Sequence, residues 1–239
     1  PEATATAMCA LASPPGASRA AVAMGEVHAA LADTLYQLGY FDMAELHYGY
    51  VVRLAEAAKE EAGGGAFVSS VRSRLALAAA KAREAIGAIC NIQERFSLAA
   101  EAYAMALAAY DQVLSESAAA EAANQDEPWK AGGSVRGRPA TTGSTGSGGS
   151  SSTSAASSSA GGRVSRDEEA RRRAEVELDA GRCRFNAGFV AKALSHAEEA
   201  VSYFEGAHAI FARVLGATHP DTVLARAESK RQTEQAAAS

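Results

Sequence analysis

The residues of this chain best suited to chemistry are its histidines and cysteines. No two histidines stand four residues apart, so no helix offers the paired imidazoles that would bind zinc. The three cysteines are far apart and outside any Cys-x-x-Cys pattern, which indicates reduced thiols in a cytosol-like compartment. Two of them, Cys90 and Cys183, fall in expected helices and are predicted to be small buried groups. The full sets are His28, His47, His196, His208 and His219, and Cys9, Cys90 and Cys183.

Catalytic sequence motifs are also missing. The chain contains no phosphate-binding GxxxxGK[ST], no dinucleotide-binding GxGxxG after a strand, no HExxH and no GxSxG. We therefore predict that the chain is not an enzyme and that it has no catalytic residues, no cofactor and no metal.

The charge pattern favours protein partners over nucleic acid or membranes. The formal net charge is −5, whereas a phosphate-binding protein needs a basic face. No apolar run approaches the roughly 18 residues of a membrane span, residues 1–24 lack a signal-peptide pattern, and no basic amphipathic helix favours lipid binding. The run RDEEARRR, residues 166–173, is interpreted as a solvated face of intramolecular ion pairs, with a basic docking patch as the alternative. We expect a cytoplasmic protein.

One segment, residues 124–164, is composed almost entirely of Gly, Ser, Thr, Ala and Pro. It lacks the apolar side chains needed to offset the entropy of ordering, so we predict a disordered linker. Trp129, the only tryptophan, stands near its start, either as a docking anchor or packed on the neighbouring helix. The predicted organisation is a flexible segment at 1–16, two helical hairpins at 17–123, the linker, and a third hairpin with a capping helix at 165–239.

Apolar residues elsewhere recur every three or four positions, which predicts α-helices, and no alternating strand pattern occurs. Gly39 is expected to end the first helix, and Asp42 with Glu45 to cap the second. Ser165 with Glu168 is expected to cap the fifth in the same way. The expected helices are 17–38, 42–61, 67–94, 96–117, 166–194, 196–215 and 220–236.

Three of these helices share a spacing of small and aromatic residues. Each has an alanine, an aromatic residue four later, and a small or β-branched residue after three more. A further small residue lies twelve positions before each alanine, in the preceding helix. Small side chains let two antiparallel helices cross closely, while the aromatic ring fills the gap toward the next hairpin. The sets are Ala44/Tyr48/Val51 with Ala32, Ala99/Tyr103/Ala106 with Gly87, and Ala200/Phe204/Ala207 with Gly188.

This pattern resembles the tetratricopeptide repeat. Near the C-terminal end, the segment LGATHPDT at 215–222 is similar to the helix junction of kinesin light chain repeats. The resemblance implies antiparallel hairpins stacked as a short α-solenoid, with His219 as part of a junction and not a ligand. The matching alanines are 55 and 101 residues apart, wider than the roughly 34 residues of the family, which implies longer helices and an intervening linker.

In tetratricopeptide proteins the first helix of each hairpin lines a groove that holds a partner peptide. By this resemblance, eight residues are candidates for protein binding. The third hairpin offers two phenylalanines flanked by two cations, which suit an apolar side chain beside a carboxylate. Alternatively, Phe185 and Phe189 pack beneath the linker or the last helix. The candidates are Tyr36 and Gln37, then Lys81 and Asn91, then Arg182, Phe185, Phe189 and Lys192.

The expected function is a non-catalytic scaffold that binds a peptide or neighbouring subunits within a larger complex. The kinesin-light-chain resemblance favours the cytoskeleton, an axoneme or a cilium. The alternative is the C-terminal helical region of a SET–MYND protein methyltransferase, which is also tetratricopeptide-like and ends in a Gly–His–Pro junction. In that case the chain lacks the catalytic part, since it has no cysteine-rich zinc cluster.

Overall fold

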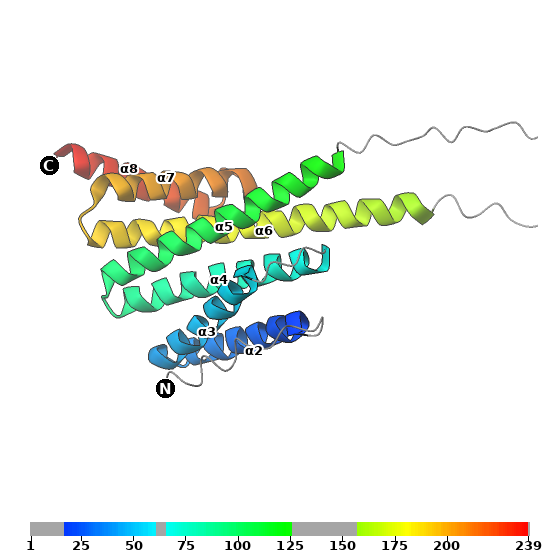
Figure 1. The fold of residues 1–239 in the computed structure, drawn as a ribbon. Coiled ribbons are helices and arrows are strands. Elements are labelled where there is room, and N and C mark those ends of the chain that lie inside the picture. The colour runs from blue at the N-terminus through cyan, green and yellow to red at the C-terminus, as the bar shows by residue number, and fades with distance from the viewer. Residues whose placement is uncertain (1–16, 61–65, 126–156, 239) are drawn as a thin grey trace, which may run out of the picture.

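The chain folds into a stack of α-helices in the computed structural model, which describes residues 17–60, 66–125 and 157–238 (Figure 1). Neighbouring helices pack together in sequence order and the described ranges contain no strand, which confirms the predicted all-α fold. The segment 1–16 and the middle of the predicted linker, with Trp129, lie outside the described residues. The helices are α2 (Ala17–Gln37), α3 (Phe41–Glu60), α4 (Ala66–Ile92), α5 (Phe96–Gln125), α6 (Ser157–Ala193), α7 (Ala197–Val214) and α8 (Pro220–Ala238).

The two ends of the predicted linker are helical. α5 continues to Gln125 and α6 begins at Ser157, whereas the sequence predicted an end near 117 and a start near 166. Ser165 therefore lies inside α6, and the expected capping of this helix by Ser165 and Glu168 is wrong. A helix that is already packed gains one hydrogen bond for each residue added at its end, so alanine-rich and serine-rich flanks extend it at small free-energy cost.

Three hairpin turns share one backbone geometry: hairpin 1 (α2 and α3), hairpin 2 (α4 and α5) and hairpin 3 (α6 and α7). Each turn has a left-handed residue, namely Gly39 (φ 80°), Glu94 (φ 60°) or Ser195 (φ 64°). These residues are 55 and 101 apart, like the repeated alanines, so the hairpins are structurally equivalent. The next N–H bonds back to the first helix, as in a Schellman motif. The bonds are Tyr40 to Leu35 (2.9 Å), Arg95 to Cys90 (2.8 Å) and His196 to Ala191 (2.9 Å).

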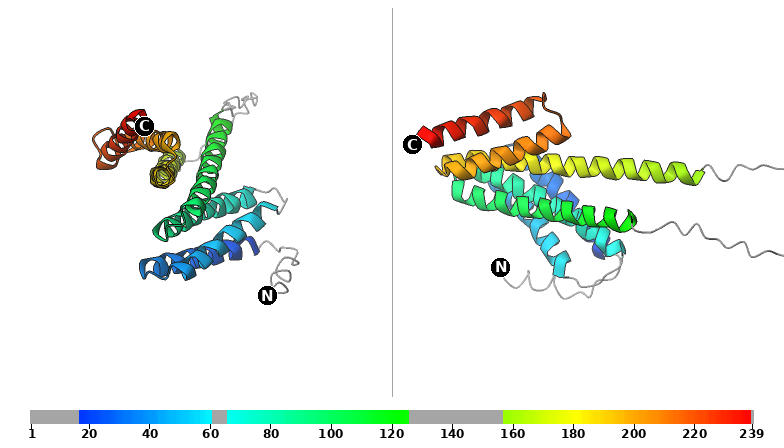
Figure 2. Two further views of the ribbon diagram at one scale, coloured as in Figure 1. Left: turned by 90° about the vertical axis from the view of Figure 1, so that its left-hand side faces the viewer. Right: turned by 90° about the horizontal axis from the view of Figure 1, so that it is seen from above.

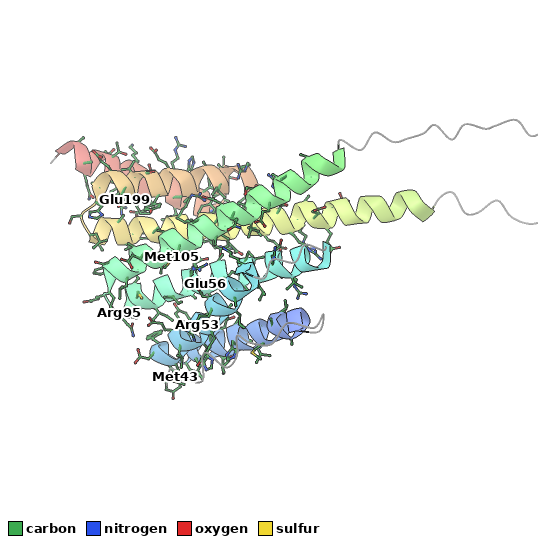
Figure 3. The ribbon with its side chains drawn as sticks, viewed as in Figure 1. Met43, Arg53, Glu56, Arg95, Met105 and Glu199 are labelled. Carbon is green, nitrogen blue, oxygen red and sulfur yellow. The ribbon has the colours of Figure 1, made fainter. Side chains whose placement is uncertain are left out.

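The acidic residues expected to cap α3 instead join hairpin 1 to hairpin 2. Asp42 accepts a hydrogen bond from the Gln93 side chain (3.2 Å), and Glu45 accepts one from Arg95 (2.6 Å). Arg95 lies at the turn of hairpin 2 (Figure 3). The prediction of a capping pair is therefore wrong, because both carboxylates reach across to the neighbouring turn.

The helices within a hairpin cross closely where the sequence predicted. A Cβ atom added to Gly87 would lie 3.0 Å from the Tyr103 ring, and one added to Gly188 would lie 2.7 Å from the Phe204 ring. Each ring thus covers the glycine of its own hairpin. As predicted, Tyr48 and Tyr103 also pack toward the next hairpin, because their buried clusters continue into α4 and α6. The cluster of Phe204 stays within hairpin 3. The repeated alanines, Ala44, Ala99 and Ala200, are fully buried.

The helices stack in sequence order from α2 at one end to α8 at the other (Figures 1 and 2). The first helices of successive hairpins also touch, α2 with α4 and α4 with α6, and these three helices are called the inner layer. α8 packs against α7 at the end of the stack. Across the described ranges, no helix has the length and apolarity that crossing a membrane requires.

One ion pair recurs at both hairpin junctions. Arg83 on α4 binds Glu56 on α3 (2.8 Å), and Arg184 on α6 binds Asp111 on α5 (3.0 Å). The cations are 101 residues apart and the anions 55, which makes the two pairs equivalent in the repeat. Glu56 lies where α3 crosses α4 (Figure 3). Both junctions therefore have the same register.

The LGATHPDT segment forms the turn between α7 and α8. Gly216 is left-handed (φ 94°), and its carbonyl accepts a hydrogen bond from the hydroxyl of Thr222 (2.8 Å), which is fully buried. The Asp221 N–H donates to Nδ1 of His219 (3.2 Å). His219 therefore serves the junction, as the resemblance implied.

Candidate protein-binding groove

The inner layer contains a cavity that includes two of the predicted groove residues. Its volume is about 270 Å³, and it lies among α4, α6, α7 and α8. Arg182 and Phe185, both predicted from the sequence, line it together with Glu84. The remaining lining residues are Asn186, Phe211, Asp221 and Leu224. The first helix of hairpin 3 thus meets α8 at a concave site.

The α8 side of this cavity was missed by the sequence analysis. Asp221 and Leu224 fall in the segment that was assigned only a junction and capping role. No signal in the sequence distinguishes Leu224 from its neighbour Val223, since the two are adjacent apolar residues and both are about half exposed in the structure.

Charged side chains surround the cavity mouth. Asp179 binds Lys81 at 2.9 Å and Arg182 at 3.4 Å, so one carboxylate holds both cations. The side chains of Lys81 and Arg182 are still more than half exposed, at 56% and 59%. They can therefore meet a second carboxylate that arrives from solvent.

Glu84, which lines the cavity, is hydrogen-bonded by a tyrosine of α5. The hydroxyl of Tyr110 donates to Glu84 at 2.8 Å. Burial raises the pKa of Glu84 above its ordinary value, and Asp179 raises it further, while Tyr110, Lys81 and Arg182 oppose the shift. Burial and the Glu84 carboxylate both raise the pKa of Tyr110, so its hydroxyl stays a donor. The cluster fixes the orientation of α4 against α5 beneath the cavity.

The two phenylalanines of α6 both pack against α7 but differ in exposure. Phe185 packs within hairpin 3, with its ring centroid 5.5 Å from that of Phe204 and 6.5 Å from that of Phe211. Phe189 packs edge-on against Phe204 at 5.2 Å yet is 38% exposed. Phe185 is therefore mainly a core residue that also lines the cavity, and Phe189 is the one available at the surface.

The other predicted groove residues lie elsewhere. Tyr36 packs against Phe41 (5.6 Å between ring centroids) at the turn of hairpin 1, and Gln37 is exposed beside it. The carbonyl of Asn91 accepts the turn N–H of hairpin 2. Lys192 lies 3.8 Å from Glu228 on α8. The structure thus joins Arg182 and Phe185 in one cavity, with Lys81 and Phe189 nearby, and leaves Tyr36, Gln37, Asn91 and Lys192 outside it.

The arginine run of α6 carries intramolecular ion pairs. Arg172 binds Glu168 (2.6 Å) and Arg173 binds Glu121 on α5 (2.7 Å). Arg171 similarly binds one turn along its own helix. These are the intramolecular ion pairs that the solvated-face interpretation predicted. A shallower hollow of about 750 Å³ lies beside these pairs, between α4, α5 and α6.

Two histidines that the sequence treated separately meet across hairpin 1. The Nδ1 atoms of His28 on α2 and His47 on α3 lie 2.9 Å apart, so one ring donates to the other. The spacing of 19 residues gave no signal, because the contact depends on how the hairpin closes. Within the described ranges, no group of three or more His, Cys, Asp or Glu side chains could hold a metal ion.

The sequence matches none of the protein-family models and none of the curated proteins. A functional proposal for this chain therefore depends on the geometry of the groove.

Proposed function

We propose that the chain is a non-catalytic scaffold that binds a segment of a partner protein along its inner layer, at the cavity between α6 and α8. The cavity carries this proposal because apolar and polar side chains line it together, as they do in ligand sites. Phe185, Phe211 and Leu224 offer the apolar surface, and Arg182 and Asn186 offer donors.

The chemistry of the cavity defines the partner segment. A volume of about 270 Å³ suits one bulky apolar side chain. Lys81 and Arg182 suit a carboxylate next to that side chain in the partner. The resemblance of residues 215–222 to kinesin light chains supports a cytoplasmic, microtubule-linked complex as the setting.

A pair of adjacent α8 residues gives a matched test. Peptides selected from a random library on the full chain would be measured by fluorescence anisotropy against Leu224→Asp and Val223→Asp. Both residues are about half exposed, but only Leu224 lines the cavity. We expect Leu224→Asp to weaken binding by at least about tenfold, since it removes apolar contact and adds charge, and Val223→Asp to leave it unchanged.

The same measurement can contradict the proposal. Equal loss of binding in the two variants, with helicity retained by circular dichroism, would place the peptide elsewhere on α8. Binding that survives both Leu224→Asp and Arg182→Ala would remove the cavity as the site. Phe185 is kept intact because its contacts with Phe204 and Phe211 support hairpin 3.

A further inference from the structure

The outward face of α2 is a stacking surface that has no neighbour within the described structure. In hairpins 2 and 3, the corresponding face of the first helix is covered by the preceding second helix, α3 or α5. The equivalents of Met24 and Val27 are Ala79 and Ala82 on α4, which are 1% and 2% exposed. On α2 itself, Met24 is 45% and Val27 66% exposed. A surface of the kind that the repeat normally buries is therefore open at this end of the stack.

Over residues 20–37, where the structure describes the side chains of α2, this face is uncharged and largely apolar. The charged residues of α2 that face the rest of the stack have partners there, Glu26 with Arg74 on α4 and Asp33 with Tyr48 on α3. A charged partner therefore has nothing to pair with on the open face. The exposed residues that form it are Ala23, Met24, Val27, Ala30, Leu31 and Thr34.

The outward face of α8, at the opposite end of the stack, carries charged side chains. The outward residues of α8 include three charged side chains, Arg226, Lys230 and Glu234, which are all exposed. Lys230 and Glu234 pair with each other (3.7 Å), but burying this exposed pair and Arg226 under an apolar face would remove their hydration and be unfavourable. Head-to-tail stacking of copies would join α8 of one copy to α2 of the next and is therefore disfavoured. Contact between the α2 faces of two copies instead pairs one apolar surface with another.

We infer that the outward face of α2 binds the same face of a second copy of this chain, forming a two-fold symmetric dimer. Met24, Val27 and Leu31 have the three- and four-residue spacing of a helix–helix seam. Met24 and Val27 are larger than Ala79 and Ala82, their equivalents on α4, where a helix of the same chain approaches closely. Large residues suit interdigitation between two α2 helices.

The symmetry fixes which residues meet. Val27 is the middle residue of α2, so an antiparallel pairing over the full helix places the two-fold axis beside it. Val27 then contacts the partner's Val27, and Met24 lies opposite the partner's Ala30 and beside its Leu31. This surface lies on the hairpin farthest along the stack from the α6–α8 cavity, so the dimer leaves the proposed groove open.

The test measures the mass of the full chain in solution over a range of concentrations. We expect a species of twice 24.5 kDa by sedimentation equilibrium. Val27→Glu should raise the dissociation constant by at least about a hundredfold, because it places two like charges together on the axis. Val223→Glu, on the α8 end and 54% exposed, is the matched control and should remain dimeric.

A symmetric disulfide checks the register. In a Cys9→Ser background, Val27→Cys should give an oxidised covalent dimer, whereas Val223→Cys should not; Cys90 and Cys183 are buried. A wild-type chain that stays monomeric at all concentrations would overturn the inference, and dimerisation only after removal of residues 1–16 would identify that segment as the occupant instead. Dissociation by Val223→Glu as strong as by Val27→Glu would mean head-to-tail contact.

Discussion

Gly188 lies beneath the ring of Phe204, and the contact is too close for any side chain. A Cβ at this position would come within 2.7 Å of Cε1 of the ring, and the ring itself is fully buried. The position therefore depends on the absence of a methyl group, although glycine inside a helix is otherwise unfavourable.

We expect Gly188→Ala to lower the free energy of unfolding by about 1–3 kcal/mol, because the extra methyl forces α6 and α7 apart. Gly49→Ala is the matched control, since its nearest neighbour is the flexible end of Arg53 at 3.7 Å. That change should raise stability by roughly 0.5–1 kcal/mol through helix propensity. Urea unfolding of both variants gives the comparison, and equal stability of Gly188→Ala and wild type would contradict the close-contact argument.

For individual residues, the sequence predicted the close contact that was found by aligning the three hairpins, and it missed contacts outside that alignment. Gly188 was identified as a small residue by its spacing from Ala200. Gly181, one heptad earlier, has the same relation to Phe211 at 2.7 Å but was not identified, because the repeat comparison stopped at one small residue per helix. The His28–His47 contact has no equivalent in the other hairpins, so no pattern could reveal it.

The hairpin turns are the elements that most clearly repeat, yet they use different residues. The left-handed position is glycine in hairpin 1, glutamate in hairpin 2 and serine in hairpin 3. A side chain in this conformation is strained, since its Cβ approaches the following carbonyl. Keeping the turn geometry therefore reduces the stability of hairpins 2 and 3.

Replacing the strained residues should stabilise the protein. We expect Glu94→Gly and Ser195→Gly each to raise the free energy of unfolding by about 0.5–1 kcal/mol, and Gly39→Ser to lower it by a similar amount. Thermal unfolding followed by circular dichroism measures all three. A lower melting temperature for both glycine variants would show that the side chains of Glu94 and Ser195 contribute more than their backbone strain removes.

The spacing of apolar residues predicted where the helices lie. The helix ends were predicted well only where a glycine terminates the helix. The glycines at 39 and 216 placed two helix ends within a residue or two. The end of α5 was misplaced because residues 118–125 are rich in alanine, a strong helix former, but carry no large apolar residue to continue the pattern. The start of α6 was misplaced because its flank is rich in serine and glycine, which are typical of linkers. The α8 side of the cavity was missed for a related reason: no repeat partner indicated which face of α8 turns inward.

At the scale of the whole molecule, the seam between α5 and α6 holds the two halves of the chain together. Tyr103, Ala106 and Tyr110 on α5 share one buried cluster with Cys183 and Ala187 on α6. Burial raises the pKa of the Cys183 thiol far above its ordinary value, so it stays protonated within this cluster. Side-chain packing between α5 and α6 forms this seam without a contribution from the segment that connects the two helices.

We therefore expect the halves to stay associated after the chain is cut. A protease site inserted between residues 126 and 156 should yield two pieces that co-elute in size-exclusion chromatography, because apolar burial at the seam outweighs the lost covalent link. A second sample carrying Ala106→Asp tests the cause, since a charge in the cluster should separate the pieces after cleavage. Separation of the unmodified halves would contradict a stable seam.

The order of helix contacts also governs how the molecule responds to tension. Within the described ranges, every helix contacts its immediate neighbours, and α2, α4 and α6 add contacts only to the next first helix. A force applied to the two ends is thus carried by seams in series, with no long-range staple that must break first. Under tension the stack should therefore extend one hairpin at a time and behave as a compliant elastic element.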